Sequence, residues 1–320
     1  MRLARSFRRL LGTAASNQVV SMVRSDGIAQ VTLKRPDKLN ALNMPMFRAI
    51  QAAARELIED KDVRAVVLHG EGRAFCAGLD LKSVMHPLEA SENMKELLLR
   101  PEGEISNLAQ DVGYLWRRVP VPVIAVTQGV CFGGGMQIAL GADMRVTSPT
   151  CRFSIMEAKW GLIPDMGASV VLPELIPKDV ALELTMTGRI FEATEALKLG
   201  LVTKVADEPL AEALHIAREI ASRSPDATAA AKRLLHATYS SNDEARALHL
   251  ESELQRKLIG GWNQMVSTTK GFGVPSLLQP RYAQRSEVWN NEADEQAEQE
   301  LRAMLDGQMV TRAASKGDTL

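Results

Sequence analysis

Three consecutive glycines constrain this chain more than any other stretch of its sequence. Gly133, Gly134 and Gly135 separate a strand-like apolar run at residues 122–126 from a helix-like run that follows directly. Glycine tolerates positive φ and lets another group approach the backbone closely, and the first N–H groups of a helix have no partner within it. The helix dipole adds positive potential at that end. The stretch is therefore either a tight strand-to-helix joint or a place that holds negative charge, such as an oxyanion.

The size, charge and cysteine content of the chain narrow the class of protein. Its 320 residues, 46% of them hydrophobic, can bury a large core in one domain and still form an appendage. A formal net charge of −1 argues against nucleic-acid binding. No apolar run approaches the roughly 18 residues that cross a membrane. Cys76, Cys131 and Cys151 lack metal-ligand spacing, which predicts a reducing compartment without a metal site or a disulfide framework.

Residues 1–16 differ from the rest of the chain. Four arginines alternate with apolar residues that fall on one helical face, and the first acidic residue of the chain is Asp26. An arginine-rich, acid-free, amphipathic start resembles a mitochondrial transit peptide and predicts a location in the mitochondrial matrix. The alternative interpretation is a basic disordered tail.

Strands and helices alternate in the first two thirds of the chain, and helices dominate afterwards. Asp26-Gly27 predicts a hairpin between strands at residues 19–24 and 28–33, and Asn43 is placed to cap a helix that follows. This order predicts an α/β core with a C-terminal helical region. We divide the chain into residues 1–16, a core at 17–205, a helical region at 206–260 and a variable, partly disordered tail at 261–320.

Several motifs in order resemble the crotonase family, which is the enoyl-CoA hydratase/isomerase family. Residues 74–81 (AFCAGLDL) resemble its first oxyanion segment, and residues 125–143, which include the glycine triplet, resemble its second. Residues 35–42, 157–164, 187–189 and 193–202 continue the match, and the resemblance covers roughly residues 17–260.

The resemblance implies a fold, a substrate and a set of binding residues. The fold is a crotonase-type spiral of ββα units that assembles into trimers or hexamers, and the substrate is an acyl-CoA thioester. Coenzyme A enters as part of the substrate, so no separate cofactor is expected. The backbone N–H groups of Leu79 and Gly134 are the implied oxyanion hole, worth about 3–4 kcal/mol for each donor. The other implied CoA-binding residues are Cys76, Ala77, Gly78, Asp80, Gly133 and Gly135.

The implied acid–base residues depart from the hydratase pattern. Gln137 occupies the position of the first hydratase glutamate, and an amide cannot accept a proton as a base. Glu157 keeps the second glutamate, and a third family position holds Asp165. This combination resembles the dienoyl-CoA isomerase branch, although that branch usually has an aspartate at position 137. Trp160 and Met166 flank the two acids and, together with Gln137, are expected to line the acyl pocket.

Plainer interpretations of these residues stay open. Glu157 is otherwise a salt-bridged structural acid, Asp165 a cap for the helix at residues 168–175, and Trp160 and Met166 core residues. We expect an isomerase that shifts double bonds in a dienoyl-CoA during fatty acid β-oxidation. The alternatives are a hydratase that adds water to 2-enoyl-CoA, and a non-catalytic acyl-CoA-binding scaffold.

Overall fold

The computed structural model of the protein describes residues 19–239, 241–272 and 280–286. The predicted transit segment at residues 1–16 lies outside these ranges, so the structure leaves that prediction as it was. Among the described residues, no helix has both the length and the apolar character needed to cross a bilayer.

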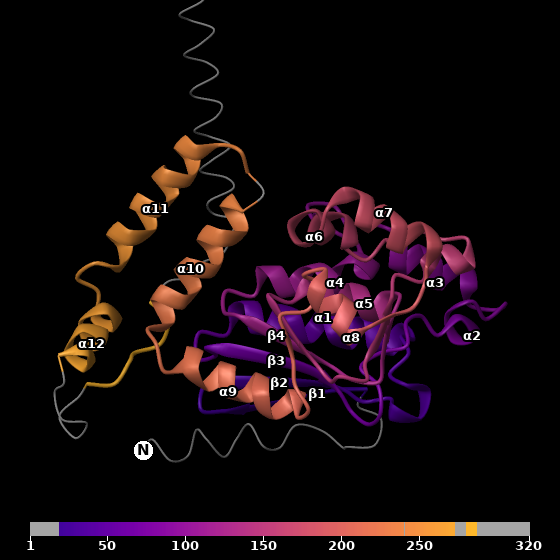
Figure 1. The fold of residues 1–320 in the computed structure, drawn as a ribbon, viewed down its shortest axis with the longest axis horizontal. Coiled ribbons are helices and arrows are strands. Elements are labelled where there is room, and N and C mark those ends of the chain that lie inside the picture. The colour runs from indigo at the N-terminus through magenta and orange to yellow at the C-terminus, as the bar shows by residue number, and fades with distance from the viewer. Residues whose placement is uncertain (1–18, 240, 273–279, 287–320) are drawn as a thin grey trace, which may run out of the picture.

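A six-stranded sheet forms the centre of the protein (Figure 1), with the strand order β1-β2-β3-β4-β6-β9. The hairpin β1–β2 is antiparallel, and every later pairing in this sheet is parallel. A second sheet, in the order β5-β7-β8, stands beside it. The strands are β1 (Val20–Ser25), β2 (Ile28–Leu33), β3 (Ala65–Gly70), β4 (Val123–Thr127), β5 (Val130–Phe132), β6 (Met144–Thr147), β7 (Arg152–Ser154), β8 (Phe191–Glu192) and β9 (Lys204–Val205).

Helices cover both faces of the large sheet and continue beyond it (Figure 1). The α-helices are α1 (Met44–Glu59), α2 (Leu81–Val84), α3 (Ala90–Leu98), α4 (Leu108–Arg118), α5 (Gly134–Gly141), α6 (Ala168–Leu175), α7 (Lys178–Thr187), α8 (Ala193–Lys198), α9 (Pro209–Ala221), α10 (Pro225–Thr238), α11 (Glu244–Leu258) and α12 (Trp262–Gly271). Two short 3₁₀ helices, η1 (Pro36–Lys38) and η2 (Glu157–Trp160), lie in the connections.

Local sequence accounts for the way these elements begin and turn. Asp26 and Gly27 both have positive φ, at 53° and 77°, as the predicted Asp-Gly hairpin requires. Asn43 Oδ1 accepts a 3.1 Å hydrogen bond from Met46 N and so caps α1, as predicted. The five residues of β4 are all buried, which is the pattern of a parallel strand that is covered on both faces.

The main hydrophobic core lies on one face of the large sheet, between the strands and the helices α1, α4 and α5. On the opposite face, α9 packs the small side chains of Ala213 and Ala217 against β3 and β4. The predicted α/β core with a C-terminal helical region is therefore confirmed. The last strand of the large sheet, β9, contains only Lys204 and Val205.

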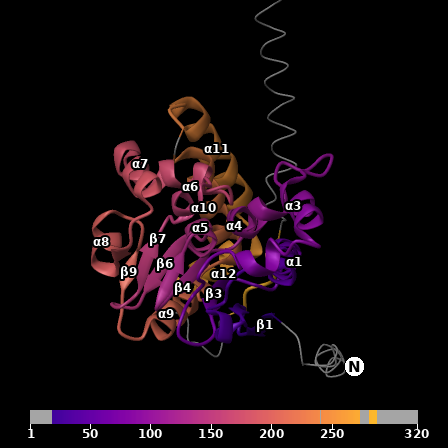
Figure 2. The same cartoon turned by 90° about the vertical axis from the view of Figure 1, so that its right-hand side faces the viewer.

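The helices α10, α11 and α12 extend away from this core (Figure 1) and lie behind it in the view of Figure 2. The helix α12 lies within the segment that the sequence analysis assigned to a variable tail. It packs against α10, and residues 281–286 return from it toward the end of α1. Both pieces of chain are therefore part of the folded protein.

Candidate active site

The first glycine-bearing turn, residues 76–80, is fixed by hydrogen bonds to Leu42. Leu42 N donates to Gly78 O at 2.8 Å, and Asp80 N donates to Leu42 O at 3.0 Å. Leu79 lies between these bonds as the parallel-bridge partner of Leu42. Neighbouring groups along an extended backbone point to opposite sides, so the N–H of Leu79 faces away from Leu42. Residue 42 is a part of this site that the sequence analysis did not single out.

The second turn is the glycine triplet, and each of its glycines has a different local environment. Gly133 has φ 51° and ψ −122°, a conformation that strains an L-residue, and its N–H donates to Ser154 O at 2.9 Å. Gly134 is the first residue of α5, where backbone N–H groups have no partner inside the helix. A Cβ on Gly135 would lie 2.5 Å from Cys76 O.

The two turns lie directly against each other. Phe132 N donates to Cys76 O at 3.0 Å, and a Cβ on Gly78 would lie 2.9 Å from Phe132 O and 3.7 Å from Gly134 N. In the described part of the chain, the N–H groups of Leu79 and Gly134 have no hydrogen-bond partner. The fold therefore brings two unpaired backbone donors to adjacent positions, as an oxyanion hole requires.

Glu157 lies beside these donors, and Gln137 holds its carboxyl group. Gln137 Nε2 donates to Glu157 Oε1 at 2.7 Å, while Gln137 Oε1 accepts from Met166 N, also at 2.7 Å. Both side chains are buried. The bond from Met166 N fixes the orientation of the amide, so that its NH₂ group can only face the carboxylate. The second oxygen, Glu157 Oε2, is buried and has no hydrogen-bond partner among the residues that the structure describes.

Burial sets the protonation behaviour of Glu157. Removal from water raises the pKa of its carboxyl group, and the nearby charge of Asp165 raises it further against the opposing hydrogen bond from Gln137. Among the described residues no cation forms an ion pair with Glu157. The alternative of a salt-bridged structural acid therefore does not describe this side chain. Its free oxygen and raised pKa suit a group that accepts and returns protons.

Asp165 lies at an exposed position, unlike Glu157. The protein around its carboxyl group nevertheless raises the pKa of Asp165 through partial burial. Asp165 is not a helix cap, because α6 begins after Gly167, whose φ is 97°. The structure thus places a deep carboxyl group and a second one nearer the surface in the same region.

The expected pocket residues divide into two groups. Met166 is buried, and a Cβ on Gly134 would lie 2.8 Å from its Sδ, so Met166 packs against the second turn. Trp160 is 62% exposed and is therefore not a core residue of the protomer. Leu162 and Ile163, which follow Trp160, are 52% and 75% exposed. An apolar surface thus lies beside the two carboxyl groups.

The remaining predicted contact residues have structural partners in the first turn. Asp80 Oδ2 accepts from Arg35 Nη2 at 3.0 Å, and Asp80 Oδ1 accepts from Ser83 N at 3.2 Å. Cys76 is buried, and its Sγ accepts a 3.4 Å hydrogen bond from Gly78 N. Burial raises the pKa of this thiol to about 12. Ala77, whose N–H donates to Leu39 O, lies between them in the same turn.

No three His, Cys, Asp or Glu side chains gather at a metal-binding distance in the described ranges.

Comparison with known proteins decides the family. The family model described as enoyl-CoA hydratase/isomerase matches residues 23–268, which is more than half of the chain. This chain belongs to the enoyl-CoA hydratase/isomerase family. The resemblance to this family in the sequence is confirmed, and so is the crotonase-type fold.

Individual relatives agree with this assignment. Enoyl-CoA hydratase EchA19 of Mycobacterium tuberculosis is 35% identical over 210 residues, which cover 65% of this chain and 76% of the relative. A relative from Dictyostelium discoideum that has the word mitochondrial in its name is 35% identical over 217 residues, covering 66% of this chain and 73% of its own. The crystal structure of enoyl-CoA hydratase from Bacillus anthracis has a TM-score of 0.72 at 26% identity, and covers 83% of this chain and 99% of that chain.

Proposed function

We propose that this enoyl-CoA hydratase/isomerase family member shifts the double bond of an unsaturated acyl-CoA, and that a 3,5-dienoyl-CoA is its substrate. The observation that carries the proposal is the state of Glu157. Its Oε1 accepts a hydrogen bond from the amide of Gln137, and its Oε2 is buried and has no partner in the described part of the chain. Isomerisation needs a carboxyl oxygen that can take up a proton from carbon, and Glu157 Oε2 can do this. Water addition in the hydratase pattern, in contrast, uses two glutamates.

In the proposed reaction the thioester oxygen binds between the N–H groups of Leu79 and Gly134. Glu157 Oε2 removes a carbon-bound proton, and the electron pair moves onto the thioester oxygen as an enolate. The two fixed donors stabilise this developing charge. Asp165 then returns a proton to a distant carbon, and the electron pair moves back to form the shifted double bond. No atom is gained or lost between substrate and product.

The protonation states that the reaction needs differ between the two acids. Glu157 starts as the base and Asp165 as the acid. The pKa of each carboxyl group is raised, and the charge of Asp165 opposes ionisation of Glu157. Two coupled carboxyl groups with raised pKa values favour a state in which the pair shares one proton. The reaction uses the arrangement of that state in which Glu157 is ionised and the proton is on Asp165, and after each turnover the proton passes from Glu157 back to Asp165 to restore it.

A hydratase that adds water to 2-enoyl-CoA is the second candidate, and the name of the Mycobacterium tuberculosis relative favours it. In that case Glu157 activates the water alone, and Gln137 orients it by hydrogen bonding. The two candidates differ in absorbance. Hydration removes the conjugation of 2-enoyl-CoA, while isomerisation of a 3,5-dienoyl-CoA creates a diene conjugated with the thioester. Faster turnover of the dienoyl substrate by the purified chain supports the isomerase, and rapid hydration with no dienoyl turnover contradicts it.

We also propose a trimer or hexamer as the working assembly and the mitochondrial matrix as its location. Exposed apolar side chains along the C-terminal helices, including Leu248, Trp262 and Phe272, support self-association. The arginine-rich, acid-free pattern of residues 1–16 and the name of the Dictyostelium discoideum relative support the location. Light scattering tests the assembly. A reporter fused to residues 1–16, compared with one whose four arginines are replaced by glutamate, tests import.

A further inference from the structure

Arg35 directly precedes the 3₁₀ helix η1, and its side chain bridges two segments of the candidate active site. Its Nη2 donates to Asp80 Oδ2 at 3.0 Å, and its Nη1 donates to Ala41 O. Ala41 comes directly before Leu42 in the chain. Asp80 comes directly after Leu79, the parallel-bridge partner of Leu42. One guanidinium group therefore joins the two segments of chain that this bridge pairs.

The loop between Arg35 and Leu42 has an unusual backbone conformation. Leu39 and Asn40 have positive φ values of 49° and 56°. Residues other than glycine adopt this conformation at a cost, so surrounding contacts have to hold it. The buried side chain of Asn40 supplies such contacts, because its Oδ1 accepts from Arg35 N at 2.8 Å and its Nδ2 donates to Ala74 O at 2.9 Å. The loop is thus braced against the chain that leads into the first turn.

The two acceptors of Arg35 suit a guanidinium group better than an ammonium group. A guanidinium has several N–H donors in a rigid fork, whereas the ammonium group of lysine is a single compact charge. Arg35 can therefore hold the carboxylate of Asp80 and the carbonyl group of Ala41 at one fixed separation. The side chains of Arg35 and Asp80 are only 16% and 19% exposed, so water and salt screen this ion pair less than a fully exposed one.

The position of the Leu79 N–H depends on the residues around it. Leu42 N donates to Gly78 O at 2.8 Å, and Asp80 N donates to Leu42 O at 3.0 Å. These bonds fix the residues before and after Leu79, and Arg35 restrains the same segments from the side. A misplacement of about 1 Å at a reacting centre can cost roughly a hundredfold in rate. Small movements of this turn should therefore matter for catalysis.

We propose that Arg35 is a positioning residue, which holds the N–H of Leu79 at the distance and angle that the thioester oxygen requires. This role rests on the proposed function, in which that oxygen binds between the N–H groups of Leu79 and Gly134. Arg35 touches no reacting atom and acts through Asp80 and Leu42. Its loss should weaken the oxyanion hole and leave the binding of the CoA portion largely intact.

The test is the absorbance of 2,4-hexadienoyl-CoA bound to the full chain. Its diene is conjugated with the thioester, so donors that draw electron density onto the thioester oxygen move the absorption band to longer wavelength. This red-shift measures the oxyanion hole without turnover. Arg35→Gln should reduce the red-shift at saturation and lower kcat on 3,5-dienoyl-CoA about tenfold, less than the loss expected for a full 1 Å misplacement. The dissociation constant of 2,4-hexadienoyl-CoA should change less than kcat.

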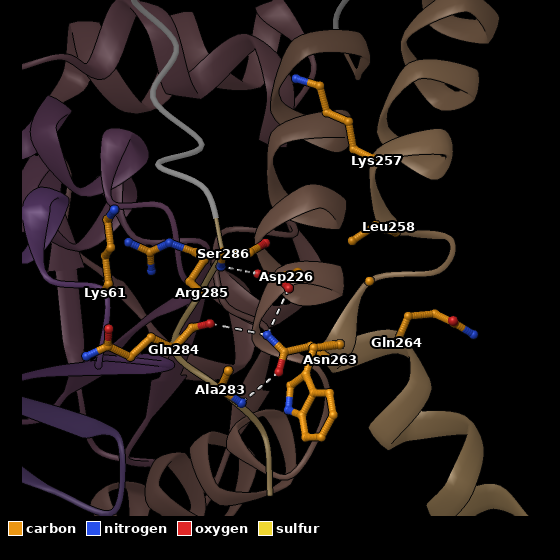
Figure 3. Close-up of a pocket in the computed structure, with 12 residues that line it drawn as sticks. Lys61, Asp226, Lys257, Leu258, Asn263, Gln264, Ala283, Gln284, Arg285 and Ser286 are labelled. Atoms are coloured by element: carbon orange, nitrogen blue, oxygen red, sulfur yellow. Dashed lines mark hydrogen bonds between the residues drawn. The ribbon is translucent and has the colours of Figure 1, made fainter. Parts of the chain in front are cut away.

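Two variants serve as controls for a general loss of stability. Arg117→Gln removes a bidentate ion pair with Glu174, whose partners are 12% and 15% exposed and so match the ion pair under test. Asn263→Ala removes a buried amide that donates to Asp226 among the C-terminal helices (Figure 3). Both variants should keep the red-shift of the starting protein, even where the melting temperature falls.

A red-shift in Arg35→Gln equal to that of the starting protein overturns the proposal, and so does a reduced red-shift that Arg117→Gln reproduces. If Arg35→Gln does not fold, Arg35→Lys decides, because lysine keeps the charge but cannot hold both acceptors in the same fork. An unchanged red-shift in that variant overturns the proposal. A starting protein without any red-shift overturns the oxyanion hole together with this role for Arg35, whereas a red-shift without dienoyl turnover contradicts only the proposed isomerisation.

Discussion

Gln137 Nε2 donates to Glu157 Oε1 at 2.7 Å, and the amide that makes this bond is itself oriented by Met166 N. The amide therefore positions one carboxyl oxygen and leaves the other, Oε2, free. Gln137 cannot supply or accept a proton, so its part in the site is to position Glu157. This pair is where the chain departs from the two-glutamate pattern of the hydratases.

Gln137→Glu should raise the rate of water addition to 2-enoyl-CoA, because it restores the missing member of the hydratase pair. The new carboxyl group would lie at hydrogen-bond distance from Glu157 Oε1, and the two acids would share one proton. Gln110→Glu is a matched control, because Gln110 serves a capping box in which glutamate works equally well. A hydration rate in Gln137→Glu that does not exceed that of Gln110→Glu would count against this role for position 137.

Gly134→Pro should lower kcat by about 10²- to 10³-fold, because it removes one donor of the oxyanion hole. Proline is tolerated at the first position of a helix, so α5 should still form. Gly134→Ala is the control: it keeps the N–H and adds a Cβ that would lie 2.8 Å from Met166 Sδ and 2.9 Å from Leu42 Cδ1. Both contacts are with the ends of side chains that can move.

The comparison of the two position-134 variants isolates the donor. Steric disturbance alone would lower the rate in both variants, whereas loss of the N–H affects only the proline. Circular dichroism checks that each variant is folded. Equal rates for a folded Gly134→Pro and for Gly134→Ala would show that the N–H of residue 134 takes no part in the reaction.

Much of this fold was predictable because its determinants are local. Asp26-Gly27 fixes a hairpin through positive φ, and Asn43 caps α1 through a bond to a residue three positions away. The positions of Gly78 and Gly134 were predictable too, because a glycine-bearing turn between a strand and a helix can be recognised from a few consecutive residues. These features need no knowledge of distant segments.

The rest depended on contacts between distant segments, which no local pattern reports. The bond between Gln137 and Glu157 joins residues 20 positions apart, and Arg285 meets the end of α1 across more than 220 residues. Asp165 lies two residues before the N-cap Gly167, a difference within the usual error of sequence-based helix boundaries. The assignment of residues 261–320 to a tail stays a prediction for the part that the structure does not describe.

Glu157→Gln should raise the melting temperature at pH 8 and leave it unchanged at pH 4. The folded-state pKa of Glu157 is raised, so its contribution to stability is fully present below its ordinary pKa of 4.5 and is lost as pH rises through the folded value. Removing the charge therefore stabilises the fold only at high pH. Each kcal/mol corresponds to about 2–4 °C for a domain of 150–250 residues, and to less for a larger one.

Glu219→Gln, on an exposed residue of α9, is the control for this experiment. Its melting temperature should differ from that of the starting protein by the same small amount at both pH values. If, relative to this control, Glu157→Gln has a lower melting temperature at pH 8 than at pH 4, then the buried charge of Glu157 does not destabilise the fold.

The pH dependence of turnover should have an acidic limb above the range of an ordinary glutamate. Glu157 must be ionised to act as a base, and burial raises its pKa, so kcat/KM should fall as pH decreases through that raised value. Asp165 must be protonated, so kcat/KM should also fall as pH rises through its own raised pKa. The profile measured on the dienoyl substrate should therefore be bell-shaped, and in Asp165→Asn the alkaline limb should disappear. An alkaline limb that persists in Asp165→Asn would show that Asp165 takes no part in the reaction.

The rate of 3,5-dienoyl-CoA isomerisation in Glu157→Gln and Asp165→Asn, measured beside the rate of 2-enoyl-CoA hydration in the starting protein, tests the central proposal most directly. Both substitutions preserve shape, so folding and CoA binding should survive. We predict that the starting protein isomerises the dienoyl substrate faster than it hydrates the enoyl substrate. Each substitution should lower the isomerisation rate about a hundredfold or more. Rapid hydration by the starting protein, together with unimpaired isomerisation in Asp165→Asn, would contradict the isomerase proposal and leave the hydratase in its place.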